Sequence, residues 1–510
     1  MFKEEHRAEV WQEIRKKDIR VFEELLTPAM LAEAAVRTGV PIIKSPLCLA
    51  TLTWLGISAA FHRMKPFAEI LKGTLKLLED QAGFANSALG RAQRNGQRRQ
   101  QKNKKKKSRH KNDPRRDDPT QVTEEAFVQA RQRMPLEFWI NLIVLLCEQF
   151  QAQHAALLRF RGFRVLAIDG TRLTLPDWAA SRKHFGTAKN ASGSHAAQAR
   201  LVLLQFPFVR LPYRYELTPL SDGETTVAGR LVKSLQRDDL LLMDAGFWSY
   251  GLFWEIQQRQ AFFATRLTSK AGLRRVRALG RHEYLVQWTP KDSRGQWRKR
   301  GLPKSIELRV IEYQIPGFRP QAIVTNLLDP QRLPREDWVR LTTDCQVRGK
   351  FRPGLFHRRW EIETTFRELK VEQGLEGSLR SRTPDSIQWE VAGHMVLYLL
   401  VRWLIVEAAC KHGLEPLQLS FSAALRELAD IRQSLLTAEG RWFQILYQRL
   451  LDRVAAHQVP RRPGRHYKRR KKARANKTSR KTTGNKTATQ SKPKRPSTAR
   501  KQRGTRAQKA

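Results

Sequence analysis

The order of predicted elements between Arg164 and Leu267 constrains the fold of this chain more than any other feature of its sequence. The segment RVLAIDG, starting at Arg164, is an apolar run that ends in an acid and a glycine, a pattern typical of a buried strand. Further strand-like runs and two segments with helical spacing follow it, giving the order β-β-β-α-β-α-β. That order predicts an α/β fold with an RNase H-like core, a mixed five-stranded sheet with helices.

The pattern changes on both sides of this core. Residues 268–330 alternate polar and apolar side chains between turns rich in glycine, proline and lysine, which predicts a β-rich insertion. The remaining segments have helical spacing or are strongly basic. We therefore divide the chain into a helical N-terminal region (1–90), a basic disordered linker (91–118), a helical connector (119–160), the first part of the core (161–267), the β insertion (268–330), the second part of the core (331–412), C-terminal helices (413–460) and a basic disordered tail (461–510).

The net charge of +47 favours a polyanionic partner such as nucleic acid. Much of this charge lies outside the predicted core. Residues 461–510 contain 21 Lys and Arg and no acid, and residues 91–116 contain 13 Lys and Arg and one acid. Such segments raise affinity for any nucleic acid through counterion release, or simply solubilise the chain, so they do not identify an activity.

Four cysteines lie far apart with no CxxC spacing, which argues against a structural zinc site and indicates a reducing compartment. The charged N-terminus does not resemble a signal peptide. The longest apolar runs, Leu47–Phe61 and Met395–Ala409, are short for a bilayer span and are expected to be buried helices. We therefore expect a cytoplasmic protein with no membrane partner.

Two acids follow apolar strands of the predicted sheet. Asp169 and Asp244 each stand where such a strand is expected to end, and parallel neighbouring strands would place their carboxylates side by side. Adjacent acids repel each other unless a cation binds between them. Taken alone, each aspartate fits a turn or a helix cap equally well.

A third acid comes from the segment FHRRWEIETTFRELKVEQG, which has helical spacing. At 100° per residue, Glu363 shares a narrow face with three other residues of this helix: Phe356, Arg359 and Lys370. An apolar stripe of Ile362, Phe366 and Leu369 lies beside that face, whereas Glu361 and Glu368 are expected to face water. Ordinary i,i+4 ion pairs of Glu363 with Arg359 and Arg367 would explain the charges, but not their position beside the apolar stripe.

Three carboxylates suit Mg²⁺ or Mn²⁺, which prefer oxygen ligands. Two such ions can support an in-line displacement at phosphorus without a protein nucleophile. The sequence contains no Walker A motif, no glycine-rich dinucleotide fingerprint and no nucleophile elbow, so we expect no small-molecule cofactor.

Four motifs in this order resemble the bacterial insertion-sequence DDE transposases of the insertion-sequence-4 family. They are LAIDGTRLTLPDW…HFG (166–186), DLLLMDAGFWSYGLF (239–253), IVTNLLDP (323–330) and the spacing Phe356-x2-Arg359-x3-Glu363-x6-Lys370, where the family signature begins with tyrosine. The resemblance covers nearly all of residues 25–470.

This resemblance implies that Asp169, Asp244 and Glu363 are the catalytic residues and bind two metal ions. It also implies that Arg359 and Lys370 bind DNA phosphates, and that Phe356 occupies a DNA-binding position but lacks the phenolic hydroxyl. The partners would be terminal inverted repeats, recognised with help from the N-terminal region, and target DNA, bound by a dimer in a synaptic complex. Ala245 also departs from the family, in which arginine is common at that position. A nuclease without joining activity and an inactive DNA-binding remnant remain the alternatives.

Overall fold

The computed structural model describes residues 22, 25–40, 47–71, 124–188, 196–267, 273–291, 295–314, 320–339, 354–438 and 440–459. The predicted basic linker and the predicted basic tail lie outside the described residues.

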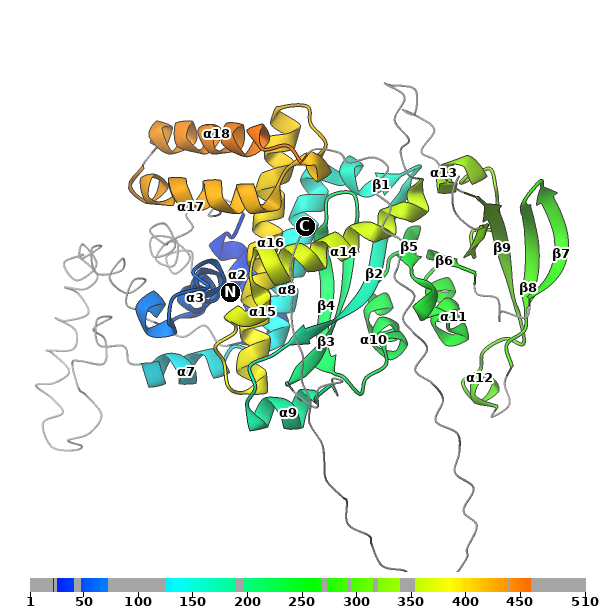
Figure 1. Ribbon diagram of the computed structural model, residues 1–510, viewed down its shortest axis with the longest axis horizontal. Coiled ribbons are helices and arrows are strands. Elements are labelled where there is room, and N and C mark those ends of the chain that lie inside the picture. The colour runs from blue at the N-terminus through cyan, green and yellow to red at the C-terminus, as the bar shows by residue number, and fades with distance from the viewer. Residues whose placement is uncertain are drawn as a thin grey trace, which may run out of the picture. The chain divides into compact units, whose positions relative to one another are not determined.

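Five strands form the centre of the fold (Figure 1). They run in the order β4-β3-β2-β5-β6, with β2 antiparallel to β3, β3 antiparallel to β4, and β5 parallel to both β2 and β6. This is the predicted RNase H-like core. Its strands are β2 (Phe163–Thr174), β3 (Gln198–Phe206), β4 (Leu211–Pro219), β5 (Asp239–Met243) and β6 (Phe262–Arg266), and a short β1 (Arg159–Phe160) pairs with β2.

The predicted β insertion extends the same sheet. Its last strand pairs antiparallel with β6, so that ten strands form one hydrogen-bonded sheet. Asn326 completes this junction, because its side-chain oxygen accepts from the Phe263 amide at 2.8 Å and its amide group donates to the Ala261 carbonyl at 3.0 Å. The elements of the insertion are β7 (Leu273–Gly280), β8 (Glu283–Trp288), α12 (Gln296–Lys299), β9 (Ile306–Tyr313) and β10 (Gln321–Thr325).

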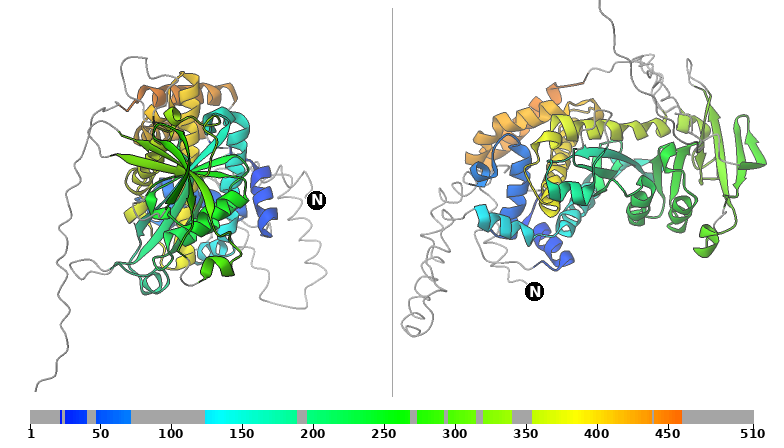
Figure 2. Two further views of the ribbon diagram at one scale, coloured as in Figure 1. Left: turned by 90° about the vertical axis from the view of Figure 1, so that its right-hand side faces the viewer. Right: turned by 60° about the horizontal axis from the view of Figure 1, so that its bottom comes forward.

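Alternating side chains of the central strands supply two separate hydrophobic clusters. Leu166 and Ile168 of β2 belong to the larger cluster, which includes residues of α10 (Glu224–Leu231) and α11 (Tyr250–Gln258). Val165 and Ala167 belong to a second cluster that includes Leu240 and Leu242 of β5. Since successive side chains of a strand point to opposite faces, the two clusters lie on opposite faces of β2 and β5. Over β3 the larger cluster includes side chains of both faces, Leu203 and Leu204 among them. Figure 2 shows the strands fanning out with helices around them, as expected for a twisted sheet.

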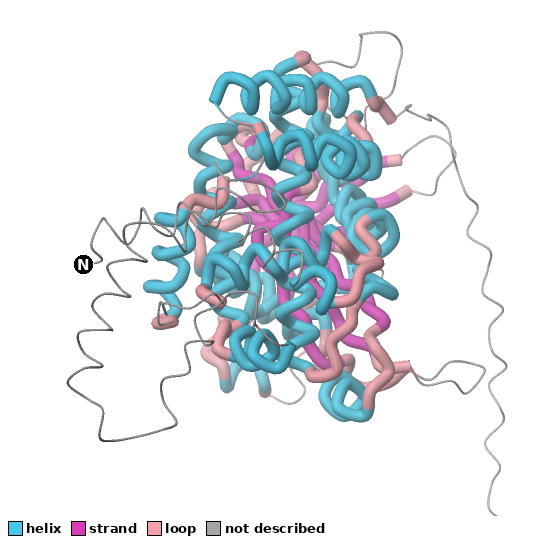
Figure 3. The backbone as a smooth tube through the Cα atoms, turned by 90° about the vertical axis from the view of Figure 1, so that its left-hand side faces the viewer, coloured by secondary structure: helices cyan, strands magenta, loops and turns pink. Residues whose placement is uncertain are grey.

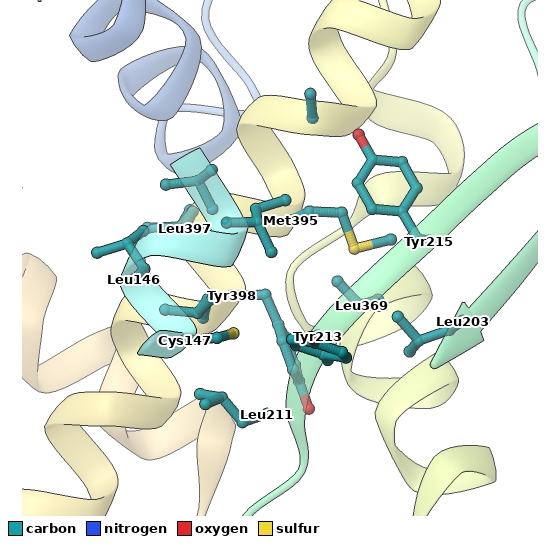
Figure 4. Close-up of a cluster of buried hydrophobic side chains, with 14 of the residues drawn as sticks. Leu146, Cys147, Leu203, Leu211, Tyr213, Tyr215, Leu369, Met395, Leu397 and Tyr398 are labelled. Atoms are coloured by element: carbon teal, nitrogen blue, oxygen red, sulfur yellow. The ribbon is translucent and has the colours of Figure 1, made fainter. Parts of the chain in front are cut away.

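A long buried helix, α16 (Pro384–Lys411), lies among the other helices on one side of the sheet (Figure 1), the side on which Figure 3 shows helices in front of the strands. By length and composition it could span a membrane, but 94% of its most apolar window is buried inside the protein. It packs with α8 (Leu136–His154) against β4, and Leu146, Leu203, Tyr215 and Met395 belong to the buried cluster there (Figure 4). Both apolar runs are therefore buried helices, as the sequence predicts.

The described part of the N-terminal region packs into this common core. Helix α3 (Leu49–Phe61) is buried along most of its length and crosses α16 at a close approach between glycines. A Cβ atom on Gly393 would lie 2.5 Å from the Gly56 carbonyl oxygen, so glycine is required there. The remaining helices are α2 (Pro28–Thr38), α7 (Glu124–Gln132), α9 (Ala179–Phe185), α13 (Arg335–Val339), α15 (Leu375–Ser378), α17 (Phe421–Thr437) and α18 (Gly440–Ala456).

Candidate active site

The pairing of β2 with β5 brings Asp169 and Asp244 together. The last paired residues are Ile168 and Met243, so the next residue on each strand is one of the two aspartates. The alternation along each strand also places them on one face, the face of Val165, Ala167, Leu240 and Leu242. Strand β2 continues to Thr174, so Asp169 lies within it and not at its end as predicted. The predicted neighbourhood nevertheless forms, because the parallel pairing with β5 ends there.

The backbone holds both aspartates in place. Asp169 remains in the ladder with β3, opposite Leu203, and its Oδ1 accepts from the Gly170 amide at 2.8 Å. The carbonyl of Asp244 accepts a hydrogen bond from the Thr265 hydroxyl at 3.1 Å. The side chain of Asp169 is 20% exposed and that of Asp244 is 44% exposed, so both can be reached from solvent.

The segment that carries Glu363 is a helix of three hydrogen-bonding patterns. It begins as the 3-10 helix η8 (Leu355–Trp360), continues as α14 (Glu361–Arg367) and ends as the π-helix η9 (Glu368–Glu372). Leu355 and Phe356 pack in the cluster beneath the two aspartates. The predicted apolar stripe is confirmed, since Ile362, Phe366 and Leu369 all pack in the larger core.

Arg359 links this helix to the two strands. Its Nη1 lies 4.0 Å from an Asp169 carboxylate oxygen, and its Nη2 lies 3.6 Å from Asp244 Oδ1. The guanidinium is buried, with Trp360 packed against it at 5.1 Å from the ring centroid. Arg359 therefore supplies positive charge to both aspartates at once.

Glu363 is exposed, one turn after Arg359, and belongs to the same electrostatic group. Burial raises the pKa of Asp169 to about 6, the Gly170 amide and Arg359 oppose this rise, and the charges of Asp244 and Glu363 add to it. The charges of Asp244 and Glu363 thus destabilise the ionised form of Asp169, which is the condition that a bound cation relieves.

The chemistry of these donors fits a divalent cation, because all three are carboxylates and hard cations prefer oxygen. Among the described residues, however, no three acidic, histidine or cysteine side chains converge closely enough to hold a metal ion as they stand. The described arrangement is one in which Arg359 supplies the counter-charge to the aspartates.

The structure places the other two predicted DNA contacts differently. Lys370 lies beside the far end of β2, where its Nζ donates to the Arg172 carbonyl and lies 3.7 Å from Glu376 Oε1. Phe356 is only 6% exposed and packs in the cluster beneath the aspartates. Its ring is therefore part of the core and does not share an open face with Glu363.

The prediction that Glu368 faces water is wrong. Glu368 is 2% exposed and binds Arg210, Tyr398 and Arg402, while Glu361 is partly buried and also binds Arg210. The helical wheel failed here because it describes one helix alone and cannot show that α16 and the β3–β4 turn cover the side of Glu361 and Glu368. A signal was present in Arg402, a charged residue in the middle of an apolar helix that requires a buried partner.

Comparisons with known proteins indicate the class of enzyme. A family model described as "Transposase DDE domain" matches residues 161–400, which contain all three carboxylates. The transposase InsG for insertion sequence element IS4 of Escherichia coli (strain K12) is 27% identical over 335 residues, covering 62% of this chain and 69% of that protein. A solved piggyBac transposase synaptic complex with hairpin DNA matches with a TM-score of 0.30 and 11% identity, over 59% of this chain and 58% of that one.

A five-stranded RNase H-like core with acids at adjacent strand positions defines the class of DDE polynucleotidyl transferases, enzymes that act on DNA. Residues 161–400 of the chain match the transposase DDE domain, and the chain is similar to the transposase of insertion sequence element IS4. Members of the DDE family use divalent metal ions.

Proposed function

We propose that this transposase moves an insertion sequence by cleaving DNA at its terminal inverted repeats and joining the freed 3′-hydroxyl to target DNA. The observation that carries this proposal is the shared position of Asp169 and Asp244 on one sheet face, with the helix of Glu363 packed over it. Asp169, Asp244 and Glu363 would hold two Mg²⁺ or Mn²⁺ ions. When bound, such ions supply the activation of an attacking oxygen and the neutralisation of charge at phosphorus.

The basic side chains near the site would then bind the DNA. With metal ions bound to the aspartates, the Arg359 guanidinium would bind a phosphate through two parallel hydrogen bonds. Lys370, further along β2, would bind a second phosphate as a point charge. These contacts fix the position of the DNA on the protein and leave its sequence to be read elsewhere, including by the N-terminal region.

We further propose that the protein works as a dimer that forms on two element ends in a synaptic complex, in the bacterial cytoplasm where its DNA substrates lie. The basic segments 91–118 and 461–510 would raise the local concentration of DNA without adding sequence preference.

The test uses the full-length protein, a DNA fragment carrying the inverted repeats of its own element, and Mg²⁺. Glu363→Gln should abolish both end cleavage and strand transfer into a supercoiled plasmid, because the amide cannot replace a carboxylate ligand. Glu255→Gln is the matched control, since that partly buried glutamate of α11 pairs with Arg259 outside the site. Cleavage that survives Glu363→Gln would refute the site. Cleavage without joining by the wild type would identify a nuclease. If the wild type does not cleave at all, the protein is an inactive DNA-binding remnant.

A further inference from the structure

The carboxylate of Glu368 is fully engaged inside the protein, five residues after Glu363. Its Oε1 accepts from Arg210 Nη1 at 2.8 Å, and its Oε2 accepts from the Tyr398 hydroxyl at 2.6 Å and from Arg402. Arg402 is completely buried, and its Nε donates to the Tyr398 oxygen at 3.1 Å. The core helix α16 thus binds the C-terminal part of the helix that carries Glu363.

Arg210 holds the same helix at a second position. Its Nε and Nη2 donate to Glu361 Oε2 at 2.9 and 2.7 Å, while its Nη1 binds Glu368. Arg210 stands in the β3–β4 turn, with φ of +52°. One guanidinium from the sheet therefore binds two carboxylates that bracket Glu363 in the sequence.

The backbone changes its hydrogen-bonding pattern at Glu368, the residue that Arg210, Tyr398 and Arg402 bind. Helix α14 ends at Arg367, and the π-helix begins at Glu368. Short π turns are rare and depend on their surroundings. The other end of this π-helix is also held, because Arg63 Nη1 donates to the carbonyls of Val371 and Glu372 at 3.3 and 3.0 Å.

Stability alone is a poor explanation for these buried charges. Burial by itself would raise the pKa of Glu368, but Arg402 and Arg210 outweigh it and keep the pKa below its ordinary value. Taking such a pair out of water costs free energy that well-packed apolar side chains would not cost, whereas an ion pair fixes one geometry.

We propose that Glu368, Tyr398, Arg402 and Arg210 form a buried network whose role is to position Glu363 over Asp169 and Asp244. These four are positioning residues, because their side chains bind one another and the helix that carries Glu363. The two aspartates have other supports, since the ladder with β3 holds the backbone of Asp169 and the Thr265 hydroxyl binds the carbonyl of Asp244. The inference rests on the proposed role of Glu363 as a metal ligand.

The test is the dependence of end cleavage on Mg²⁺ concentration in the full-length protein. Glu368→Gln should raise the Mg²⁺ concentration for half-maximal cleavage about 10-fold, the scale on which residues that orient metal ligands act. Binding of the end DNA in EDTA should stay unchanged. Tyr398→Phe, which removes one hydroxyl and leaves the ion pair, should shift the same midpoint about 3-fold, as a fraction of that effect.

A matched control separates positioning from stability. Arg309 and Glu283 form another buried ion pair, between β9 and β8 of the insertion. Glu283→Gln should lower the melting temperature about as much as Glu368→Gln while leaving the Mg²⁺ midpoint unchanged.

The inference is overturned if Glu368→Gln keeps the wild-type Mg²⁺ midpoint, or if Glu283→Gln shifts that midpoint equally. Should Glu368→Gln fail to fold, Tyr398→Phe decides by the same measurement. If Glu363→Gln is inactive while the network variants behave as wild type, only the positioning role fails. If Glu363→Gln still cleaves, the proposed function itself is wrong.

Discussion

The three proposed ligands are held in two different ways. Asp169 lies in the ladder with β3, and Asp244 directly follows the last residue of β5 that pairs with β2, so backbone pairing fixes both positions. Glu363 stands on a helix that passes through 3-10, α and π turns and is anchored by side chains from three other parts of the chain. The sheet therefore supplies a rigid half of the site, and the helix supplies a half whose geometry depends on buried contacts.

The largest expected effect comes from the rigid half. Asp169→Asn or Asp244→Asn should slow end cleavage by about 10³-fold or more, because each loss of about 1.4 kcal/mol in transition-state stabilisation slows a reaction tenfold. The fold should not suffer. Burial raises the pKa of Asp169, so its ionised form costs stability at neutral pH, and the neutral amide removes that cost.

Cleavage assays and melting curves on the same preparations check this prediction. The expected pair of results is inactivity with a melting temperature equal to or above that of the wild type. A large drop in melting temperature would show that these aspartates are structural residues of the sheet.

The next effect distinguishes the two halves directly. Leu369 on the π-helix and Leu204, opposite Ile168 on β3, are both fully buried. Leu204 is the better control, because its side chain points to the other face of the sheet, whereas Leu203 lies beside Leu369 (Figure 4). Changing Leu369 or Leu204 to alanine should lower the free energy of unfolding by about 2–5 kcal/mol. Only Leu369→Ala should also raise the Mg²⁺ midpoint for cleavage, because only that leucine anchors the helix of Glu363.

Urea unfolding gives the stability of both variants, and a Mg²⁺ titration gives the midpoints. Equal shifts in midpoint would remove the distinction between a rigid half and a dependent half.

The same distinction explains what the sequence could predict. Strand order and the period of two were enough to predict that Asp169 and Asp244 lie together, because each aspartate follows a strand that its own local sequence identifies. The helical wheel identified the buried stripe of Ile362, Phe366 and Leu369, yet it placed Glu368 in water and Phe356 beside Glu363. Glu368 is buried because Arg210 and Arg402, residues distant in sequence, cover its side of the helix, and Phe356 is displaced because it lies in a 3-10 helix. The sharing of one sheet by core and insertion likewise depends on the pairing of β10 with β6.

A smaller effect tests the position of the missing family tyrosine. Phe356→Tyr should not raise cleavage, because the ring packs in the cluster beneath the aspartates and not at a DNA-facing surface. A buried hydroxyl without a partner should cost about 1–3 kcal/mol of stability. Cleavage rates under single-turnover conditions and a melting curve decide the matter, and a clear gain in rate would place the hydroxyl on DNA after all.

The smallest effect concerns the backbone of the rigid half. A Cβ atom on Gly170 would lie 3.1–3.2 Å from the Glu224 side chain, whose flexible end can move aside. Gly170→Ala should therefore lower the free energy of unfolding by about 1 kcal/mol, the low end of the range for overpacking.

Gly246, two residues after Asp244, is the control, because no atom lies within 4 Å of a Cβ atom placed there. Gly246→Ala should leave stability unchanged or slightly higher. Urea midpoints measure both variants, and the Mg²⁺ midpoint should move in neither, because the ladders on each side of Asp169 absorb a shift of the Glu224 side chain. A shifted Mg²⁺ midpoint in Gly170→Ala alone would show that the strand half of the site is less rigid than its hydrogen bonding implies.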